Sequence, residues 1–174
     1  MKRNGFTFIE LIISIAVLAV LAGFILYTLN PFVQFQKSRD ARRKSDLGQI
    51  QKALEQYYQD HEQYPPSSGS NNGSDSYEIM DTSSNYPPGT PIKWGGTTPV
   101  WQKYIEVLPK DPDPQKTYAY LTDPSGQMYW LYASLDRGTK DPDACTGGIC
   151  QNIGGANCGS SACNYGVSSP NTNP

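Results

Sequence analysis

The chain has 174 residues, and its 14 lysines and arginines against 16 aspartates and glutamates give a formal net charge of −2. This length is enough for about one domain, and the near-neutral balance argues against nucleic acid as the main partner. The single histidine, His61, excludes the two-histidine motif of zinc metalloproteases and disfavours a histidine-activated nucleophile. No catalytic constellation is visible, so the sequence predicts a protein that is not an enzyme.

A long apolar segment follows Lys2 and Arg3 and carries no charged residue from Leu11 to Gln36. About 20 apolar residues in a helix span a bilayer, so the segment is a membrane anchor or a secretory signal. A signal peptide is disfavoured, because its apolar region would be shorter and no Ala-x-Ala cleavage site follows. A plain anchor leaves Glu10 unexplained, since a carboxylate beside such a segment is costly unless a cation pairs with it.

The stretch GFTFIE at residues 5–10, behind a short basic leader, resembles the processing site of type IV pilins and pseudopilins. In that family a membrane peptidase cuts after the glycine and methylates the new N-terminal amine. The resemblance implies a cut between Gly5 and Phe6, which removes a leader of residues 1–5. It also implies that Glu10 pairs with the Phe6 amine of a neighbouring subunit and fixes the register of a helical filament.

The helical pattern continues into the polar part of the chain. Apolar or aromatic residues recur there at spacings of three or four, which predicts one face of an amphipathic helix. These residues are Leu47, Ile50, Leu54, Tyr57 and His61. The helix should end before Tyr64, because two prolines follow it. A continuous helix from Phe6 to about Glu62 would be about 85 Å long at 1.5 Å per residue. His61 is expected to pack or cap near its end.

We expect residues 6–36 to form the transmembrane and assembly half of this helix, and residues 37–174 to form a globular head. Two helix breakers, Gly23 and Pro31, interrupt the first half. Pro31 predicts either a simple bend near the membrane boundary or, as the resemblance to pilins implies, a segment that loosens when subunits pack. Asp40 and Asp46 are interspersed with the basic residues of the cluster from Lys37 to Lys44. They predict a solvated face that pairs with a neighbouring subunit rather than with DNA or lipid.

Two strands are predicted in the head, over Thr117–Thr122 and Met128–Leu135, and residues 123–127 between them have hairpin chemistry. A short helix is predicted over Pro99–Leu108. Residues 67–76 predict a loop that contains a glycosylation acceptor pattern at Asn72. The segment LPKDP at residues 108–112 and the two strands resemble the major pseudopilins of type II secretion. The predicted fold is therefore α+β and pilin-like, a long helix packed on a small antiparallel sheet.

The four cysteines lie close together in the C-terminal region. They are Cys145, Cys150, Cys158 and Cys163. An even, clustered set predicts two disulfides formed outside the cytoplasm that staple a C-terminal loop region. Zinc is disfavoured, because zinc sites more often use two-residue spacers. Three pairings are open to four cysteines, and the sequence does not choose among them.

Three aspartates, Asp136, Asp141 and Asp143, fall in a loop where major pseudopilins carry a calcium site. Carboxylates and loop carbonyls are the oxygen ligands that calcium prefers. The ligand pattern of the family does not match here residue for residue. A solvated acidic loop is therefore favoured over calcium, and no other cofactor is predicted.

The sequence predicts a prepilin that is cleaved, N-methylated and polymerised into a type IV pilus or pseudopilus. One alternative is the major pseudopilin of a type II secretion system, and another is an anchored surface domain that binds a ligand without polymerising. The resemblance implies further copies of the chain, a prepilin peptidase and an assembly platform as partners. It also implies a single-pass precursor in the inner membrane and a mature subunit in an extracellular or periplasmic filament.

Overall fold

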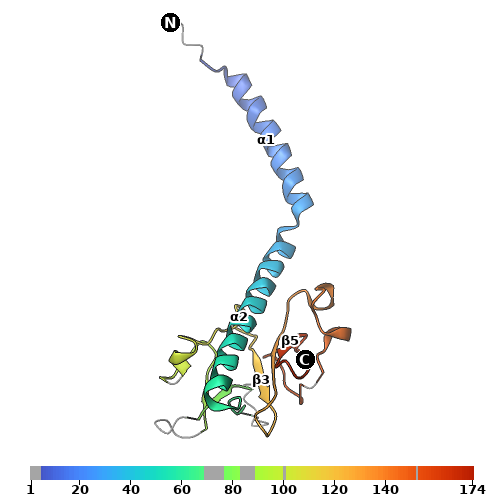
Figure 1. Ribbon diagram of the computed structural model, residues 1–174. Coiled ribbons are helices and arrows are strands. Elements are labelled where there is room, and N and C mark those ends of the chain that lie inside the picture. Colours follow the sequence, from blue (N-terminus) through green and yellow to red (C-terminus); the bar gives the residue numbers. More distant parts are fainter. Residues whose placement is uncertain (1–4, 69–76, 83–88, 100, 152) are drawn as a thin grey trace. The chain divides into compact units, whose positions relative to one another are not determined.

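The computed structural model describes residues 5–68, 77–82, 89–99, 101–151 and 153–174 (Figure 1). Asn72 and most of the predicted loop at residues 67–76 lie outside these ranges. The chain forms two compact units, Met1–Lys37 and Ser38–Pro174. We refer to the second unit as the head.

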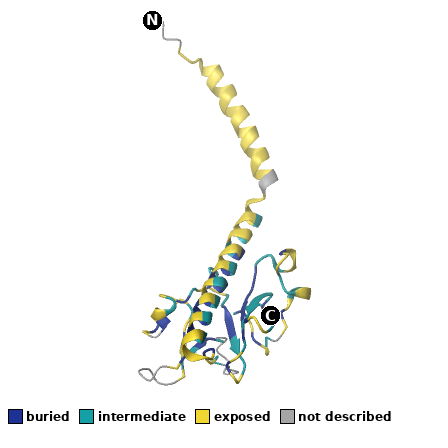
Figure 2. Ribbon diagram, in the orientation of Figure 1, coloured by how far each residue is buried: buried dark blue, intermediate teal, exposed yellow. Residues whose placement is uncertain are grey.

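Helix α1 (Phe8–Leu29) contains the apolar segment. Its residues Phe8–Tyr27 have a mean hydropathy of 2.8 and are long and apolar enough to cross a membrane. Figure 2 shows the described part of this helix as exposed. The helix begins after Thr7, whose hydroxyl Oγ1 accepts a hydrogen bond from the Glu10 backbone N–H at 3.3 Å. This is the usual way in which a threonine caps a helix N-terminus.

Helix α1 ends at Leu29, and helix α2 (Pro31–His61) begins two residues later. Asn30 between them adopts a left-handed conformation with φ of 39°, which asparagine tolerates better than most residues. The expected continuous helix is therefore two helices, because the residue before a proline is disfavoured in the helical region while proline itself suits a first helical position. Gly23 differs from its expected role: α1 runs through it, since a glycine inside a helix costs only about 1 kcal/mol.

In the part of the head that the structure describes, the strands form two antiparallel sheets. The larger one has the strand order β3-β4-β5, with β4 in the centre. The predicted hairpin is confirmed, and Asp123 shapes its turn by accepting hydrogen bonds from the backbone N–H groups of Gln127 at 2.8 Å and Met128 at 2.7 Å. The strands are β1 (Ile79–Asp81), β2 (Thr90–Ile92), β3 (Ala119–Thr122), β4 (Tyr129–Ala133) and β5 (Tyr165–Ser168). The short helix predicted over Pro99–Leu108 is one 3-10 turn, Trp101–Lys103.

The core of the head lies between α2 and the three-stranded sheet (Figure 2). The helix contributes Leu47, Ile50 and Leu54, which are fully buried, and the sheet contributes Leu131 and several tyrosines. Burying such aliphatic side chains stabilises a fold by about 1.5–3 kcal/mol each. The predicted packing of the sheet against this face of the helix is confirmed. His61, the last residue of α2, stacks on Tyr57 with ring centroids 4.2 Å apart.

The tyrosines of the core keep their hydroxyl groups hydrogen-bonded. The hydroxyl of Tyr118 donates to Asp46 at 2.7 Å, and that of Tyr120 donates to the backbone carbonyl of Pro65 at 2.7 Å. Tyr129 donates to Glu55 on α2 at 3.1 Å. A buried hydroxyl without a partner would destabilise the core. The rings therefore fill the space between helix and sheet while their polar ends are satisfied.

Two disulfides close neighbouring loops, Cys145–Cys150 and Cys158–Cys163. Three of the four cysteines are buried, and Cys163 packs with Ala119, Ala156 and Tyr132 in a second, smaller core. The two predicted disulfides are confirmed, and the structure selects the sequential pairing. No free cysteine is found among the residues described above.

We expect the double substitution Cys158→Ser with Cys163→Ser to lower the free energy of unfolding by more than the loop entropy of about 2 kcal/mol. Both cysteines are fully buried, so serine hydroxyls would enter an apolar core. The Cys145–Cys150 bridge closes a loop of the same length, but Cys145 is only half-buried. The double substitution Cys145→Ser with Cys150→Ser therefore serves as the control. Urea unfolding of the full chain in detergent measures the free energy of unfolding of both double variants. Equal losses in the two would show that burial of the cysteines does not add to the effect of the bridge.

Candidate functional site

The peptide bond between Gly5 and Phe6 lies outside the helix. Residues 5–7 are non-helical, and α1 begins only after the Thr7 cap. A Cβ atom added to Gly5 would meet no atom within 4 Å, and its φ is not in the left-handed region. Nothing in the described chain therefore requires glycine at this position. A requirement for glycine would come from a molecule that binds this segment.

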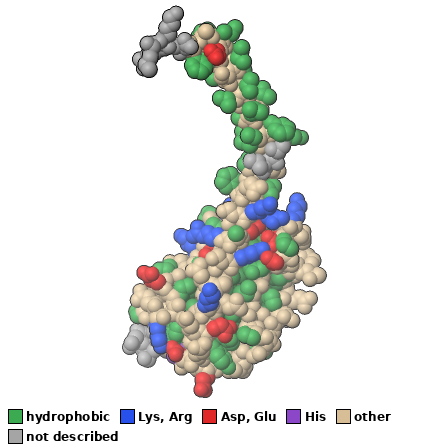
Figure 3. Space-filling view, turned by 45° about the horizontal axis from the view of Figure 1, so that its top comes forward, with side chains coloured by type: hydrophobic (Ala, Val, Ile, Leu, Met, Phe, Trp, Pro, Cys, Tyr) green, Lys and Arg blue, Asp and Glu red, His purple; other side chains and the backbone are tan. Residues whose placement is uncertain are grey.

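Glu10 is the third residue of α1, in its first turn. The sequence from Thr7 to Glu10 has the form of a capping box, in which a threonine caps the helix and a glutamate follows three residues later. A negative charge here also interacts favourably with the helix dipole. The hydrophobic side chains around it are exposed along the helix (Figure 3). Within the described part of the chain, no ion pair to Glu10 is found.

In the head, Arg43 of α2 is fully buried within an ion-pair network. Its Nε and Nη2 atoms donate to the two carboxylate oxygens of Asp111 at 2.8 and 2.9 Å. Its Nη1 atom lies 2.8 Å from Asp40 and 3.0 Å from Asp136. Burial lowers the pKa of Arg43, but the hydrogen bond and charge of Asp111 outweigh this effect, and the pKa is raised. We call these four residues the Arg43 site; it joins α2 to two loops of the head.

The prediction that this basic cluster forms a solvated face is therefore wrong for Arg43, which is buried. Lys44 also forms its ion pairs within the head of the same chain. The Lys44 ammonium lies 2.6 Å from Asp141 and 2.7 Å from Asp143. Asp40 and Arg43 continue the three- and four-residue spacing of the core face, which explains why they turn inward. Their spacing indicated that both residues lie on the buried face of α2, but a search for apolar residues alone passes over them because they are charged. Figure 3 shows basic and acidic side chains gathered side by side on the head.

The three aspartates considered for calcium occupy two separate places. Asp136 belongs to the Arg43 site and also lies 2.7 Å from Lys116. Asp141 and Asp143 instead contact Lys44. Burial raises the pKa of Asp136 and Asp141, but their hydrogen bonds from Lys116 and Lys44, with the nearby positive charges, outweigh it and lower both. Within the described ranges, no three acidic, histidine or cysteine side chains are grouped to hold a metal. The arrangement does not fit calcium.

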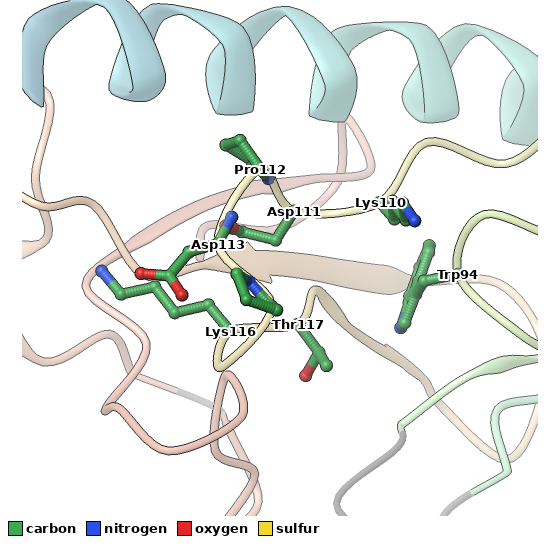
Figure 4. A pocket seen from close by; sticks show the side chains of 8 residues that line it. Trp94, Lys110, Asp111, Pro112, Asp113, Lys116 and Thr117 are labelled. Carbon is green, nitrogen blue, oxygen red and sulfur yellow. The ribbon is translucent and has the colours of Figure 1, made fainter. Parts of the chain in front are cut away.

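A hollow of about 360 Å³ lies beside the loop at residues 110–117 (Figure 4). The ring of Trp94 forms one wall and packs edge-on against Tyr118, with ring centroids 5.7 Å apart. Lys116, which lines the opposite side, already donates to Asp136 and to the backbone carbonyl of Ser134 at 3.1 Å. Asp111 at the base is held by Arg43. These charged groups serve the ion pairs of the head rather than a pairing of nucleophile and base.

Comparisons with known proteins point to the N-terminal segment and extend beyond it. Residues 1–26 match the family model described as the prokaryotic N-terminal methylation motif. The chain is 26% identical over 140 residues to the type II secretion system core protein G of Vibrio cholerae serotype O1 (strain ATCC 39315 / El Tor Inaba N16961). This alignment covers 80% of the chain and 77% of that relative. No solved structure matches. By this motif and this similarity the chain resembles type IV pilins and type II secretion pseudopilins, and its long apolar helix, small antiparallel sheets and two disulfides fit a pilin-like α+β fold.

Proposed function

We propose that the protein is a prepilin, which is cut between Gly5 and Phe6, methylated on the Phe6 amine and assembled as a repeating filament subunit. The observation that carries this proposal is the methylation motif in front of an exposed apolar helix. The Gly5–Phe6 bond is non-helical and precedes the Thr7 cap, so a peptidase would not have to unwind α1 to bind it. Within the described residues, a Cβ added at Gly5 would meet nothing within 4 Å, as expected if an enzyme rather than the fold requires this glycine.

The exposed surface of α1 supports both a membrane state and a polymer state. Bulky side chains such as Phe24, Ile25 and Leu26 are more than half exposed. A continuous apolar surface of this kind must be covered by lipid or by other proteins. Before assembly, the inner membrane would cover it. In a filament, the α1 helices of neighbouring subunits would take the place of lipid.

In this proposal the chain has three parts. Residues 1–5 are the leader, residues 6–36 are the membrane and assembly segment, and residues 37–174 are the head displayed on the filament surface. Glu10 accepts the Phe6 amine of the neighbouring subunit and so fixes the register between helices. The partners are further copies of the chain, a prepilin peptidase and an assembly platform in the inner membrane.

The similarity to core protein G favours a second candidate within the same class, a major pseudopilin of a type II secretion system. The two candidates share processing and polymerisation and differ in where the filament acts. Electron microscopy of filaments sheared from the cell surface distinguishes them in unmodified cells. Long surface filaments that contain the chain support a pilus, whereas their absence together with a secretion defect on deletion supports a pseudopilus.

We expect Gly5→Leu to leave the precursor uncut, because a bulky side chain would occupy the position that the peptidase reads as glycine. Mass spectrometry of the membrane fraction should find a wild-type N-terminus at methylated Phe6 and an intact leader in the variant. Gly23→Leu is the matched control, since it adds the same side chain at another glycine where an added Cβ meets nothing within 4 Å, and it should be processed normally. A Gly5→Leu chain cut at Phe6, or a wild-type chain cut near Ala22, would contradict the proposal.

A further inference from the structure

We propose that the side-chain ammonium of Lys44 takes the structural place of a bound calcium ion in this head. It fastens the acidic loop after β4 to helix α2, so that the loop folds without a metal. We call Lys44, Asp141 and Asp143 the Lys44 site. This inference concerns the head alone and does not depend on whether the chain polymerises.

The first support is the geometry of the two carboxylates. Oδ1 of Asp141 and Oδ2 of Asp143 converge on the Lys44 nitrogen at 2.6 and 2.7 Å. Asp141 also accepts a hydrogen bond from the Asp143 backbone N–H at 3.0 Å, which holds the two residues together. The ammonium therefore occupies the point where oxygens of both carboxylates meet. A metal ion at that point would have to displace it.

The second support is the charge at the site. Arg137 places its Nη1 atom 3.7 Å from the second oxygen of Asp141, so two cations face two carboxylates. Calcium sites gather six to eight oxygen ligands and depend on an excess of negative charge. Asp136, the third aspartate of the loop, points instead to Arg43 and Lys116. The site is close to neutral without any ion.

The third support is what the ammonium connects. Lys44 is on α2, the two aspartates lie 97 and 99 residues later in the chain, and the ammonium also lies 5.5 Å above the ring of Tyr165 on β5. One side chain thus links the helix, the loop and the last strand. The loop lies directly before the first disulfide, and Cys145 follows Asp143 by two residues. A metal bound only within the loop would not make this link.

The first measurement is the urea midpoint of the full wild-type chain in detergent, with millimolar calcium or with EGTA. We expect the same midpoint in both, because no ion is part of the folded loop. A higher midpoint with calcium would overturn the proposal. Isothermal titration with calcium alone gives an independent result, and saturable binding that requires Asp141 and Asp143 would also overturn it.

The second measurement is a double-mutant cycle between Lys44→Met and Asp141→Asn. Lys44→Met leaves two carboxylates without their main cation, and we expect the ratio of folded to unfolded protein to fall about tenfold. Adding Asp141→Asn should recover much of this loss, because the charge left unpaired is then removed. Arg42→Met, two residues earlier and 64% exposed at its side chain, is the control and should change the ratio little.

A local readout separates loosening of the loop from general destabilisation. Amide hydrogen exchange should accelerate at residues 138–148 in Lys44→Met while the amides of β4 keep their protection. Lys44→Arg retains a cation at this position and should keep the loop protected. Unchanged exchange in Lys44→Met, or additive effects in the double-mutant cycle, would show that the ammonium does not fasten the loop.

Discussion

Glu10→Gln is expected to abolish filament assembly while the chain is still processed, inserted and folded. Glutamine keeps the size and hydrogen-bonding capacity of the side chain, and it fits the third position of a capping box as well as glutamate does. The start of α1 should therefore be preserved and only the charge removed. An incoming Phe6 amine would then enter an apolar bundle without its counter-charge, which costs several kcal/mol, about 3–5 when one partner of a buried pair is missing.

The measurement compares sheared surface filaments with the membrane-embedded monomer pool, and mass spectrometry verifies the cut in each variant. Glu10→Ala should behave in the same way and should insert into the membrane at least as well as the wild type. Ser14→Ala is the control, because its hydroxyl only donates to the Glu10 backbone carbonyl, at 2.7 Å, one turn along the helix. If either Glu10 variant assembles as well as the wild type, Glu10 serves the peptidase or has no role in assembly.

Arg43→Met should lower the free energy of unfolding of the head by about 3–5 kcal/mol, because it leaves the buried carboxylates of Asp40 and Asp111 without their main partner. Natural domains are stable by only about 5–15 kcal/mol. The variant is therefore expected to accumulate poorly in cells. All three tryptophans lie in the head, so their fluorescence during urea unfolding of the full chain reports on this unit.

Two further variants refine the Arg43 test. Arg42→Met changes a neighbouring arginine with an exposed side chain, whose Nε lies 3.9 Å from Asp46. Asp46 keeps its hydrogen bond from Tyr118 without Arg42, so the loss should stay below about 1 kcal/mol. Arg43→Lys keeps the charge but cannot contact both oxygens of Asp111 through a planar guanidinium. Its loss in the free energy of unfolding should therefore lie between those of Arg42→Met and Arg43→Met. An Arg43→Met chain as stable as Arg42→Met would show that the Arg43 site does not hold the head together.

Local patterns in the sequence predicted the parts of the fold that depend on near neighbours. The processing motif is six consecutive residues, and the core face of α2 repeats every three or four residues. The β3–β4 hairpin depends on Asp123 and Gly126 within its own turn. Each of these features is set by residues a few positions apart, so a single sequence contains enough information to find it.

The features that escaped prediction depend on distant partners. Strand β5 is a four-residue segment with a glycine, and only its pairing with β4 makes it a strand. Arg43 resembles a surface residue until Asp111, 68 residues away, is brought to it. Asn30 is a local exception: it ends α1 through its own left-handed backbone, and the right-handed helical region is disfavoured for it because Pro31 follows. A periodicity rule that counts only apolar residues passes over a charged residue on the buried face.

The sequential disulfides have a consequence for how fast the oxidised chain forms. Each bridge joins cysteines five positions apart in the sequence, and a loop of about ten residues already closes within about 10–100 ns. A cysteine therefore meets its native partner far more often than a cysteine of the other loop. Oxidation should reach the native pairing without a slow exchange among mispaired species. Neither bridge depends on the other, so under the proposed export of the head each one can form as soon as its own loop has crossed the membrane, in the order of translocation.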